Sequence, residues 1–125
     1  MIDPGPLSAA AFQAETGIPD AVMERLRTHV AVLERWRRKM NLVSAKSFED
    51  VWRRHVLDSA QLAALIPPGA KNIVDMGSGA GFPGLVLAAV IPVRVTLIES
   101  NARKCAFLRR AAREMGIEAE IVHGR

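Results

Sequence analysis

Several residue types are scarce in this chain of 125 residues, and each scarcity narrows the class of protein. Tyrosine is absent and Cys105 is the single cysteine, so no disulfide can form within the chain and nothing indicates an oxidising compartment. The longest apolar run, from Leu85 to Ile91, is far shorter than the roughly 20 residues that cross a bilayer. No basic region followed by an apolar run marks a signal peptide. We therefore expect a cytoplasmic protein with no membrane partner.

Basic residues outnumber acidic ones by 17 to 13, which gives a formal net charge of +4 and an isoelectric point of about 10.0. The excess is modest and is spread along the sequence. A polyanionic partner such as nucleic acid would account for it, and so would an arginine-rich surface that meets only solvent. Charge alone leaves both interpretations open.

The chain divides at Pro67-Pro68-Gly69, a tripeptide that stops a helix. Residues 1–66 show only helical patterns, whereas residues 67–125 alternate between strand and helix. The second segment predicts, in order, strand 72–76, helix 83–90, strand 93–98, helix 102–115 and strand 119–122. This βαβαβ order is typical of the start of a parallel, Rossmann-like sheet. We therefore expect an α/β protein with an N-terminal helical segment.

Two helices are predicted early in the first segment. Ser8 can cap a short helix that Gly17 ends. A longer helix is expected over residues 19–40, because apolar side chains recur there at three- and four-residue spacing. The members of this stripe are Val22, Leu26, Val30, Leu33, Trp36 and Met40.

A third helix is expected to run on to the prolines, beginning at Ser47 and Asp50, which have the spacing of a capping box. Arg54, His55 and Asp58 lie on it within about one turn, and an ion pair between Arg54 and Asp58 is a sufficient structural explanation for them. From the residues alone, His55 is better explained as an interface residue than as a catalytic one. The other histidines have no sequence neighbours that suggest metal ligation, so we predict no metal site.

A glycine-rich loop, Asp75-Met-Gly-Ser-Gly-Ala-Gly81, follows the first strand and continues into Phe82-Pro-Gly84. A loop at the carboxyl end of a parallel strand is placed to bind a ligand. Residues 79–84 match the dinucleotide pattern G-x-G-x-x-G, and Glu99 stands 20 residues after Gly79. A carboxylate there can accept hydrogen bonds from the ribose of a nicotinamide dinucleotide or of S-adenosylmethionine. Glu99 therefore indicates an adenosine without selecting between them.

Asp75 separates these two ligands. It stands two residues before Gly77, at the lip of the site, where a pyrophosphate would meet like-charge repulsion. S-adenosylmethionine carries a sulfonium and an ammonium group and has no phosphate. We therefore favour S-adenosylmethionine, with an NAD-dependent oxidoreductase module and a turn that binds nothing as the alternatives.

Residues 74–85 (VDMGSGAGFPGL), residues 41–44 (NLVS) and residues 54–59 (RHVLDS) occur together in this chain. In this combination the chain resembles the glucose-inhibited division protein B family, the guanine-N7 methyltransferases of small-subunit (16S) ribosomal RNA. The resemblance covers most of residues 30–125. Its R-H-x-x-D-S and G-F-P-G elements are not general features of methyltransferases, so it is more specific than a glycine motif alone.

The resemblance implies a Rossmann-like, S-adenosylmethionine-dependent methyltransferase. It implies that Gly77 and Phe82 contact S-adenosylmethionine and that Glu99 lies at its ribose. The candidate cofactor residues are Asp75, Gly77, Gly79, Phe82 and Glu99.

The resemblance further implies 16S rRNA or the small ribosomal subunit as the partner. Arg54, His55 and Asp58 match the family's N-terminal element and become candidates for shaping the active site or holding RNA. No catalytic residue is assigned. Guanine N7 attacks through its own lone pair and needs no general base, so positioning would supply most of the catalysis.

The sequence ends soon after its third predicted strand, whereas the family has a seven-stranded sheet. The resemblance thus implies that only the first βαβαβ half is present, as a fragment without activity of its own. Ile73 and Val74 would then lie at a bare edge, which favours self-association. A non-catalytic RNA-binding fragment, with salt-dependent RNA affinity and no binding of a methyl donor, is the remaining alternative.

Overall fold

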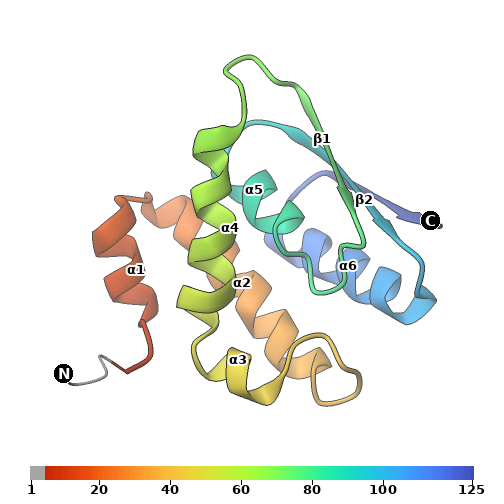
Figure 1. Cartoon of the computed structure of the whole chain (residues 1–125), viewed down its shortest axis with the longest axis horizontal. Coiled ribbons are helices and arrows are strands. Elements are labelled where there is room, and N and C mark those ends of the chain that lie inside the picture. The colour runs from red at the N-terminus through yellow and green to blue at the C-terminus, as the bar shows by residue number, and fades with distance from the viewer. Residues whose placement is uncertain (1–4) are drawn as a thin grey trace.

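The computed structural model describes residues 5–125, which form a group of helices beside a small sheet (Figure 1). In chain order the elements are α1 (Ala9–Thr16), α2 (Asp20–Trp36), α3 (Ala45–Glu49), η1 (Trp52–Leu57), α4 (Asp58–Gln61), η2 (Leu62–Leu65), β1 (Asn72–Met76), α5 (Gly84–Val90), β2 (Arg94–Glu99), α6 (Ala102–Met115) and β3 (Ala119–His123). Within this described part, none of the helices combines the length and the apolar character that a bilayer crossing needs.

The first helix, α1, forms as its capping residues predict. The Ser8 Oγ accepts a hydrogen bond from the Ala11 amide at 3.0 Å, which satisfies one of the free N–H groups of the first turn. Gly17 ends the helix in the left-handed conformation, with φ of 70°. Phe12, the buried side chain of α1, packs against the Trp52 ring at 5.3 Å between centroids and so attaches the helix to the core.

The second helix, α2, is shorter than predicted and buries a different stripe. It ends at Trp36 rather than Met40, and the Lys39 amide donates to the Trp36 carbonyl at 3.0 Å in the turn that follows. The cations at positions 37–39 come directly after the helix, where its carbonyl dipoles attract positive charge. The buried side chains are Met23, Leu26, His29, Val32 and Leu33. The buried face is therefore rotated relative to the predicted stripe, because His29 turns inward.

The predicted capping box at Ser47 and Asp50 is wrong. Ser44 is the cap of α3, since its Oγ accepts a hydrogen bond from the Ser47 amide at 3.0 Å. The Asp50 carboxylate points elsewhere: it accepts hydrogen bonds from the Leu7 amide at 2.8 Å and from Arg53 Nη1 at 2.6 Å. Asp50 therefore holds the N-terminal segment against the helices instead of starting a helix.

The third helix runs nearly to the prolines, as expected, but it is interrupted at Asp50 and changes its helical form. After α3 the chain changes from the π-helical η1 to the short α4 and then to the 3₁₀-helical η2. These forms differ in the number of residues per turn, so no single apolar period runs through the segment. Among the side chains of this stretch, Val56 and Ser59 are buried. The segment thus keeps one side in the core while its other side carries polar residues toward the loop after β1.

The sheet is parallel, with the strand order β1-β2-β3. Each strand is within one residue of its prediction, and α5 and α6 make the two crossovers. Both crossovers run in the same direction, so their right-handed sense places both helices on one face. Val95 and Leu97 point to that face and are fully buried. The carboxyl end of β1, which carries the glycine loop, lies beside the carboxyl end of β2.

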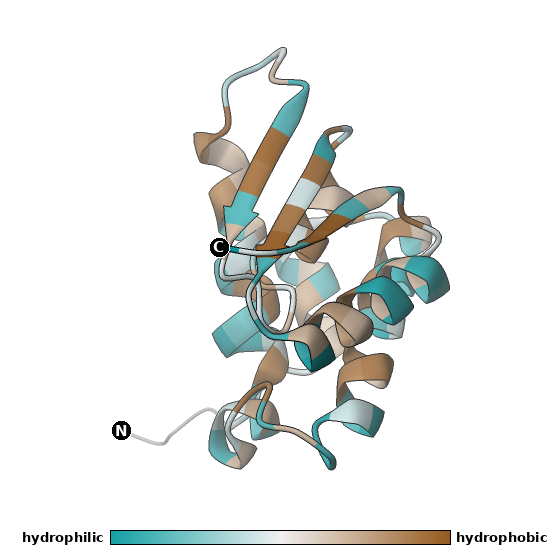
Figure 2. Cartoon of the chain, turned by 90° about the vertical axis from the view of Figure 1, so that its right-hand side faces the viewer, coloured by the Kyte–Doolittle hydropathy of each residue, from teal (hydrophilic) through white to brown (hydrophobic). Residues whose placement is uncertain are grey.

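The opposite face of the sheet is exposed. In the register of the sheet, Val74 pairs with Thr96, and Met76 pairs with Ile98, which pairs with Val122. The exposed fractions are 58% for Val74, 71% for Met76 and 36% for Val122. Figure 2 shows the apolar residues along β1. β1 is an edge strand and Val74 is exposed there, as expected, whereas Ile73 points to the covered face and is half-buried.

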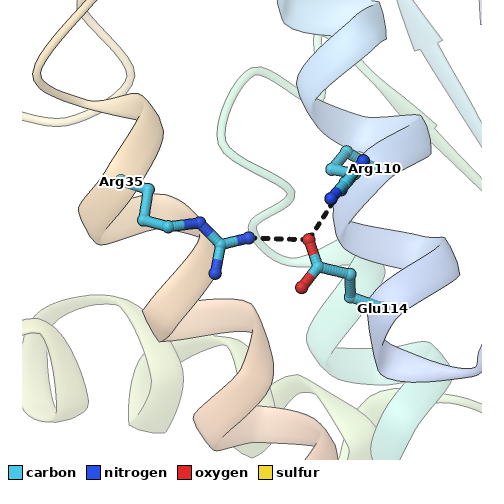
Figure 3. Close-up of polar contacts among 3 residues, drawn as sticks. All are labelled: Arg35, Arg110 and Glu114. Carbon is cyan, nitrogen blue, oxygen red and sulfur yellow. Dashed lines mark hydrogen bonds and ion pairs between the residues drawn. The ribbon is translucent and has the colours of Figure 1, made fainter.

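One apolar core joins the helices to the sheet. It runs from Leu7 and Phe12 through α2 and the sheet to Met115, and it includes fully buried Phe107 and Leu108 of α6. At the surface, the Glu114 Oε2 accepts hydrogen bonds from Arg35 Nη2 and Arg110 Nε, both at 2.7 Å (Figure 3). Arg35 belongs to α2 and the other two to α6, so this ion-paired group joins the two longest helices.

Candidate functional site

The glycine loop begins at the end of β1 and stays attached to β2. The Gly77 amide donates to the Ile98 carbonyl at 2.8 Å, so the pairing of the two strands continues into the loop. Gly77 has a φ of 74°, which favours glycine, and no atom lies within 4 Å of the position where a Cβ would stand. The backbone at Gly77 is therefore open to close approach by a ligand.

Asp75 connects the end of β1 to the start of α5. Its Oδ2 accepts a hydrogen bond from the Gly84 amide at 3.0 Å, one of the free N–H groups at the amino end of that helix. Asp75 is half-buried. Burial raises the pKa of this carboxyl group, and the Gly84 hydrogen bond acts in the opposite direction. The predicted acid at the lip of the site therefore already has a partner in the helix terminus.

Glu99 attaches the middle of the loop to the end of β2. Its Oε1 accepts from the Gly79 amide and its Oε2 from the Asn101 amide, both at 2.8 Å. Burial raises the pKa of this carboxyl group, but these hydrogen bonds and the Lys104 charge outweigh it, so the pKa lies below its usual value. Glu99 is therefore ionised at neutral pH. The Ser100 amide also lowers its pKa. A carboxylate has about four lone-pair sites, so some capacity to accept hydrogen bonds remains beyond these amides.

His29 supports the loop from behind and was missed as a site residue in the sequence. Its ring is fully buried, and Nε2 lies 2.8 Å from the Ala80 carbonyl. Burial is the main reason that its pKa falls to about 4, so the ring is neutral at pH 7 and Nε2–H donates to that carbonyl. The spacing of three from Leu26 and four to Leu33 was the signal that could have placed it on the buried face.

The third glycine of the loop makes room for this histidine. A Cβ at Gly81 would stand 3.1 Å from His29 Nε2 and 2.6 Å from Leu85 Cδ1. Its φ of 88° also lies in the left-handed region. Gly81 therefore lets the loop lie directly on α2 and α5.

Phe82 connects the loop to the helical segment. Its ring stacks against His29 at 4.7 Å and against His55 of η1 at 4.9 Å between centroids. The peptide bond to Pro83 is cis. His55 Nε2 also lies 3.0 Å from the Ser47 Oγ. These contacts with the Phe82 ring and the Ser47 hydroxyl support the interpretation of His55 as an interface residue.

The sequence-predicted residues of the helical segment surround one cavity of about 200 Å³. Its lining consists of Arg54, His55, Asp58, Ser59, Leu62, Phe82 and Pro83. The expected ion pair between Arg54 and Asp58 does not form among the described residues, because the π-helical turn changes the spacing along this segment. Both charged groups are exposed.

The candidate residues thus form two adjoining parts. Asp75, Gly77, Gly79 and Glu99 belong to the loop and the strand ends, and Phe82 belongs to both the loop and the cavity. Burial and the Arg54 charge lower the pKa of His55, so it is neutral at pH 7 and its ring presents a polar edge without a formal charge. Across residues 5–125 no three His, Cys, Asp or Glu side chains are grouped as metal ligands.

Comparison with known proteins gives one family. The family model for rRNA small subunit methyltransferase G matches residues 22–125. The ribosomal RNA small subunit methyltransferase G of Rhodospirillum centenum is 50% identical over 113 residues, which are 90% of this chain and 52% of that protein. The protein of the same name from Rhodospirillum rubrum is 50% identical over 107 residues, 86% of this chain and 53% of its own length.

A more distant relative extends the match over nearly the whole chain. The ribosomal RNA small subunit methyltransferase G of Parvibaculum lavamentivorans is 42% identical over 127 aligned positions, which cover 97% of this chain and 56% of that protein. The chain therefore spans about half the length of the curated relatives that it matches. On the family model and these identities together, the chain belongs to the rRNA small subunit methyltransferase G family.

Proposed function

We propose that this chain provides the S-adenosylmethionine site of an enzyme that methylates guanine N7 in small-subunit (16S) ribosomal RNA. The hydrogen bond between Asp75 Oδ2 and the Gly84 amide is the observation that carries the choice of ligand. In dinucleotide-binding folds, the pyrophosphate sits at the amino end of the helix after the glycine loop. Here the Gly84 amide already donates to the Asp75 carboxylate, so a pyrophosphate placed there would be repelled by that negative charge. A cationic methyl donor would be attracted by it.

The residues present fit the adenosine and methionine parts of S-adenosylmethionine. Glu99, at the end of β2, has lone pairs left for the ribose hydroxyls. Gly77 offers backbone with free space beside it. When bound, S-adenosylmethionine supplies an electrophilic methyl group on a positively charged sulfur. The work of the chain is to fix that group at the strand ends, with Asp75 as the nearby negative charge.

The cavity beside the loop is the proposed place for the target base. Phe82 borders both the cavity and the glycine loop, and Arg54 and Asp58 offer groups for the edge of a base or a phosphate. Guanine N7 attacks with its own lone pair, so no side chain has to remove a proton. Positioning then supplies most of the catalysis, and a carboxylate near the product can stabilise its positive charge.

Calorimetric titration tests the choice of ligand. We expect S-adenosylmethionine to bind and NAD to give no heat of binding. In Glu99→Gln an amide nitrogen would face the Gly79 or the Asn101 amide, so we expect methyl-donor affinity to fall by at least about tenfold. Glu120→Gln, an exposed change on β3, is the control and should bind as the parent does, with thermal melts to check folding. Tighter binding of NAD than of S-adenosylmethionine would refute the proposal.

The substrate is tested by methyl transfer. Small ribosomal subunits and their RNA are incubated with radiolabelled donor and either this chain or a version extended to the length of its relatives. We expect label at N7 of guanine with the extended protein. Label on another atom or another class of RNA would contradict the proposed substrate.

A further inference from the structure

A second and larger cleft lies between the end of α2 and the start of α6. Its volume is about 590 Å³. It is lined by Arg37, Arg38, Lys39, Met40, Asn41, Asn101, Arg103 and Lys104. Five of these eight residues are cations and none is acidic. The cations come from two segments more than 60 residues apart in sequence, so the fold, and not a local charge run, brings them together.

This cleft contains most of the charge excess of the protein. Two carboxylates are near it: Glu34 forms ion pairs of 3.7 Å with Arg37 and 3.6 Å with Arg38, and Glu99 lies at its edge, where the Lys104 charge lowers its pKa. Removing the five cations, Glu34 and Glu99 from the totals of 17 and 13 leaves 12 basic and 11 acidic residues in the rest of the chain. Three of the four net positive charges are therefore at one place.

The cleft is held in shape by contacts that leave cationic groups available. Arg103 Nη2 donates to the Lys39 carbonyl at 3.3 Å, which joins its two sides. The Asn101 Oδ1 caps α6 by accepting from the Arg103 and Lys104 amides. Arg37 lies over the Phe48 ring at 4.1 Å, and its buried Nε has no hydrogen-bond partner within residues 5–125. Like charges held this close repel one another until an anion binds between them.

We infer that this cleft binds the phosphates of an RNA strand, as a docking surface separate from the cavity at Phe82. The inference rests on the proposed function for the choice of RNA as the polyanion. The cleft adjoins the cofactor site, since Glu99 Oε2 accepts from the Asn101 amide at its edge. The cleft would hold the phosphate backbone of an RNA strand beside the glycine loop, without contacts that distinguish one base from another. Phosphate contacts of this kind position a nucleic acid and make affinity depend on salt.

The test compares two double variants of equal charge. Arg38→Gln with Lys39→Gln removes two cations of the cleft and keeps Arg103 in its bridging place. Arg25→Gln with Arg27→Gln removes two exposed cations of α2, about two turns or more from its end. Binding of a fluorescently labelled single strand of small-subunit rRNA is measured by anisotropy over a range of salt, with S-adenosylmethionine titrated in parallel.

The cleft variant should weaken RNA binding by at least about tenfold and reduce the slope of log affinity against log salt by about 1.4, or 0.7 per lost phosphate contact. The α2 variant should retain parent affinity, and both should bind the methyl donor normally. Three results would overturn the inference. The two variants could lose RNA affinity equally, the parent could fail to bind RNA, or polyglutamate of equal charge could displace the RNA. A cleft-dependent RNA interaction without binding of S-adenosylmethionine would instead refute the proposed function and leave the inference standing.

Discussion

The two flanks of the glycine loop differ in how they are held. Toward β2 and α2, the loop is fixed by the Glu99 carboxylate and by the Ala80 carbonyl bonded to buried His29. On the other side of β1, no further strand pairs with it among the described residues, and its side chains Val74 and Met76 are exposed. The contacts that fix the position of this loop are therefore on its β2 and α2 side. The geometry of the loop should therefore be sensitive to changes on one flank and tolerant of changes on the other.

The largest effect is expected for Gly81→Ala on the held flank. Left-handed backbone costs an alanine about 1 kcal/mol or more, and the clash with Leu85 and His29 adds about 1–3 kcal/mol. Gly116→Ala is a matched control, because its φ of 70° is also positive and no atom lies within 4 Å of the added Cβ. Denaturant unfolding measures both. Equal losses of stability would show that the packing behind Gly81 contributes nothing.

A pH effect of about 2 kcal/mol is expected from His29. Its pKa is about 4 in the folded chain and 6.5 when exposed, so the unfolded chain binds more protons between these values. Stability therefore falls as pH decreases from about 6.5 to 5, by up to 1.36 kcal/mol per pH unit. His55, whose pKa is also lowered, adds in the same direction. In His29→Gln the slope should be clearly reduced, and an unchanged slope would assign the effect to other groups.

The smallest effect on stability is expected on the open flank. Val74→Thr should change the free energy of unfolding by less than about 0.5 kcal/mol, since the side chain is mostly exposed. Val95→Thr makes the same change at a fully buried position on the neighbouring strand and should cost about 1–3 kcal/mol. Similar costs at the two positions would show that the outer face of the sheet is covered in solution.

The same flank carries a proposal about association. We propose that the exposed β1 edge pairs with another copy of the chain, because an uncovered apolar edge strand is a template for strand addition. Sedimentation at increasing concentration should show a reversible dimer, and Val74→Lys should weaken it. A stable monomer at all concentrations would contradict the proposal.

The sequence predicted the parts of the fold that follow from local chemistry. Ser8, Gly17 and Gly116 end or begin helices because their caps act within a few residues, and the three strands lie within one residue of their predicted places. The π-helical turn could not be predicted in this way. It follows Asp50, whose carboxylate accepts a hydrogen bond from the Leu7 amide, 43 residues away in sequence.

The candidate site divides in the same manner. Asp75, Gly77, Gly79 and Glu99 were placed together because strand ends of a parallel sheet meet at one edge, and their ligand contacts remain predictions. His29 was not proposed, since its partner, the Ala80 carbonyl, lies 51 residues away. The basic cleft was missed for a similar reason: its cations are modest in number within each segment and become a cluster only when α2 and α6 pack.

Gly81 shows that one glycine of the loop pattern serves packing within the protein. A run of alternating glycines is usually taken to describe a ligand, yet the space in front of Gly81 is filled by His29 and Leu85 of the protein itself. The third glycine of the pattern thus depends on His29 of α2, which stands 52 residues earlier in the chain. A glycine at this position therefore indicates a helix packed behind the loop as well as a ligand in front of it. The glycine pattern is most informative when it is read together with the sequence of α2.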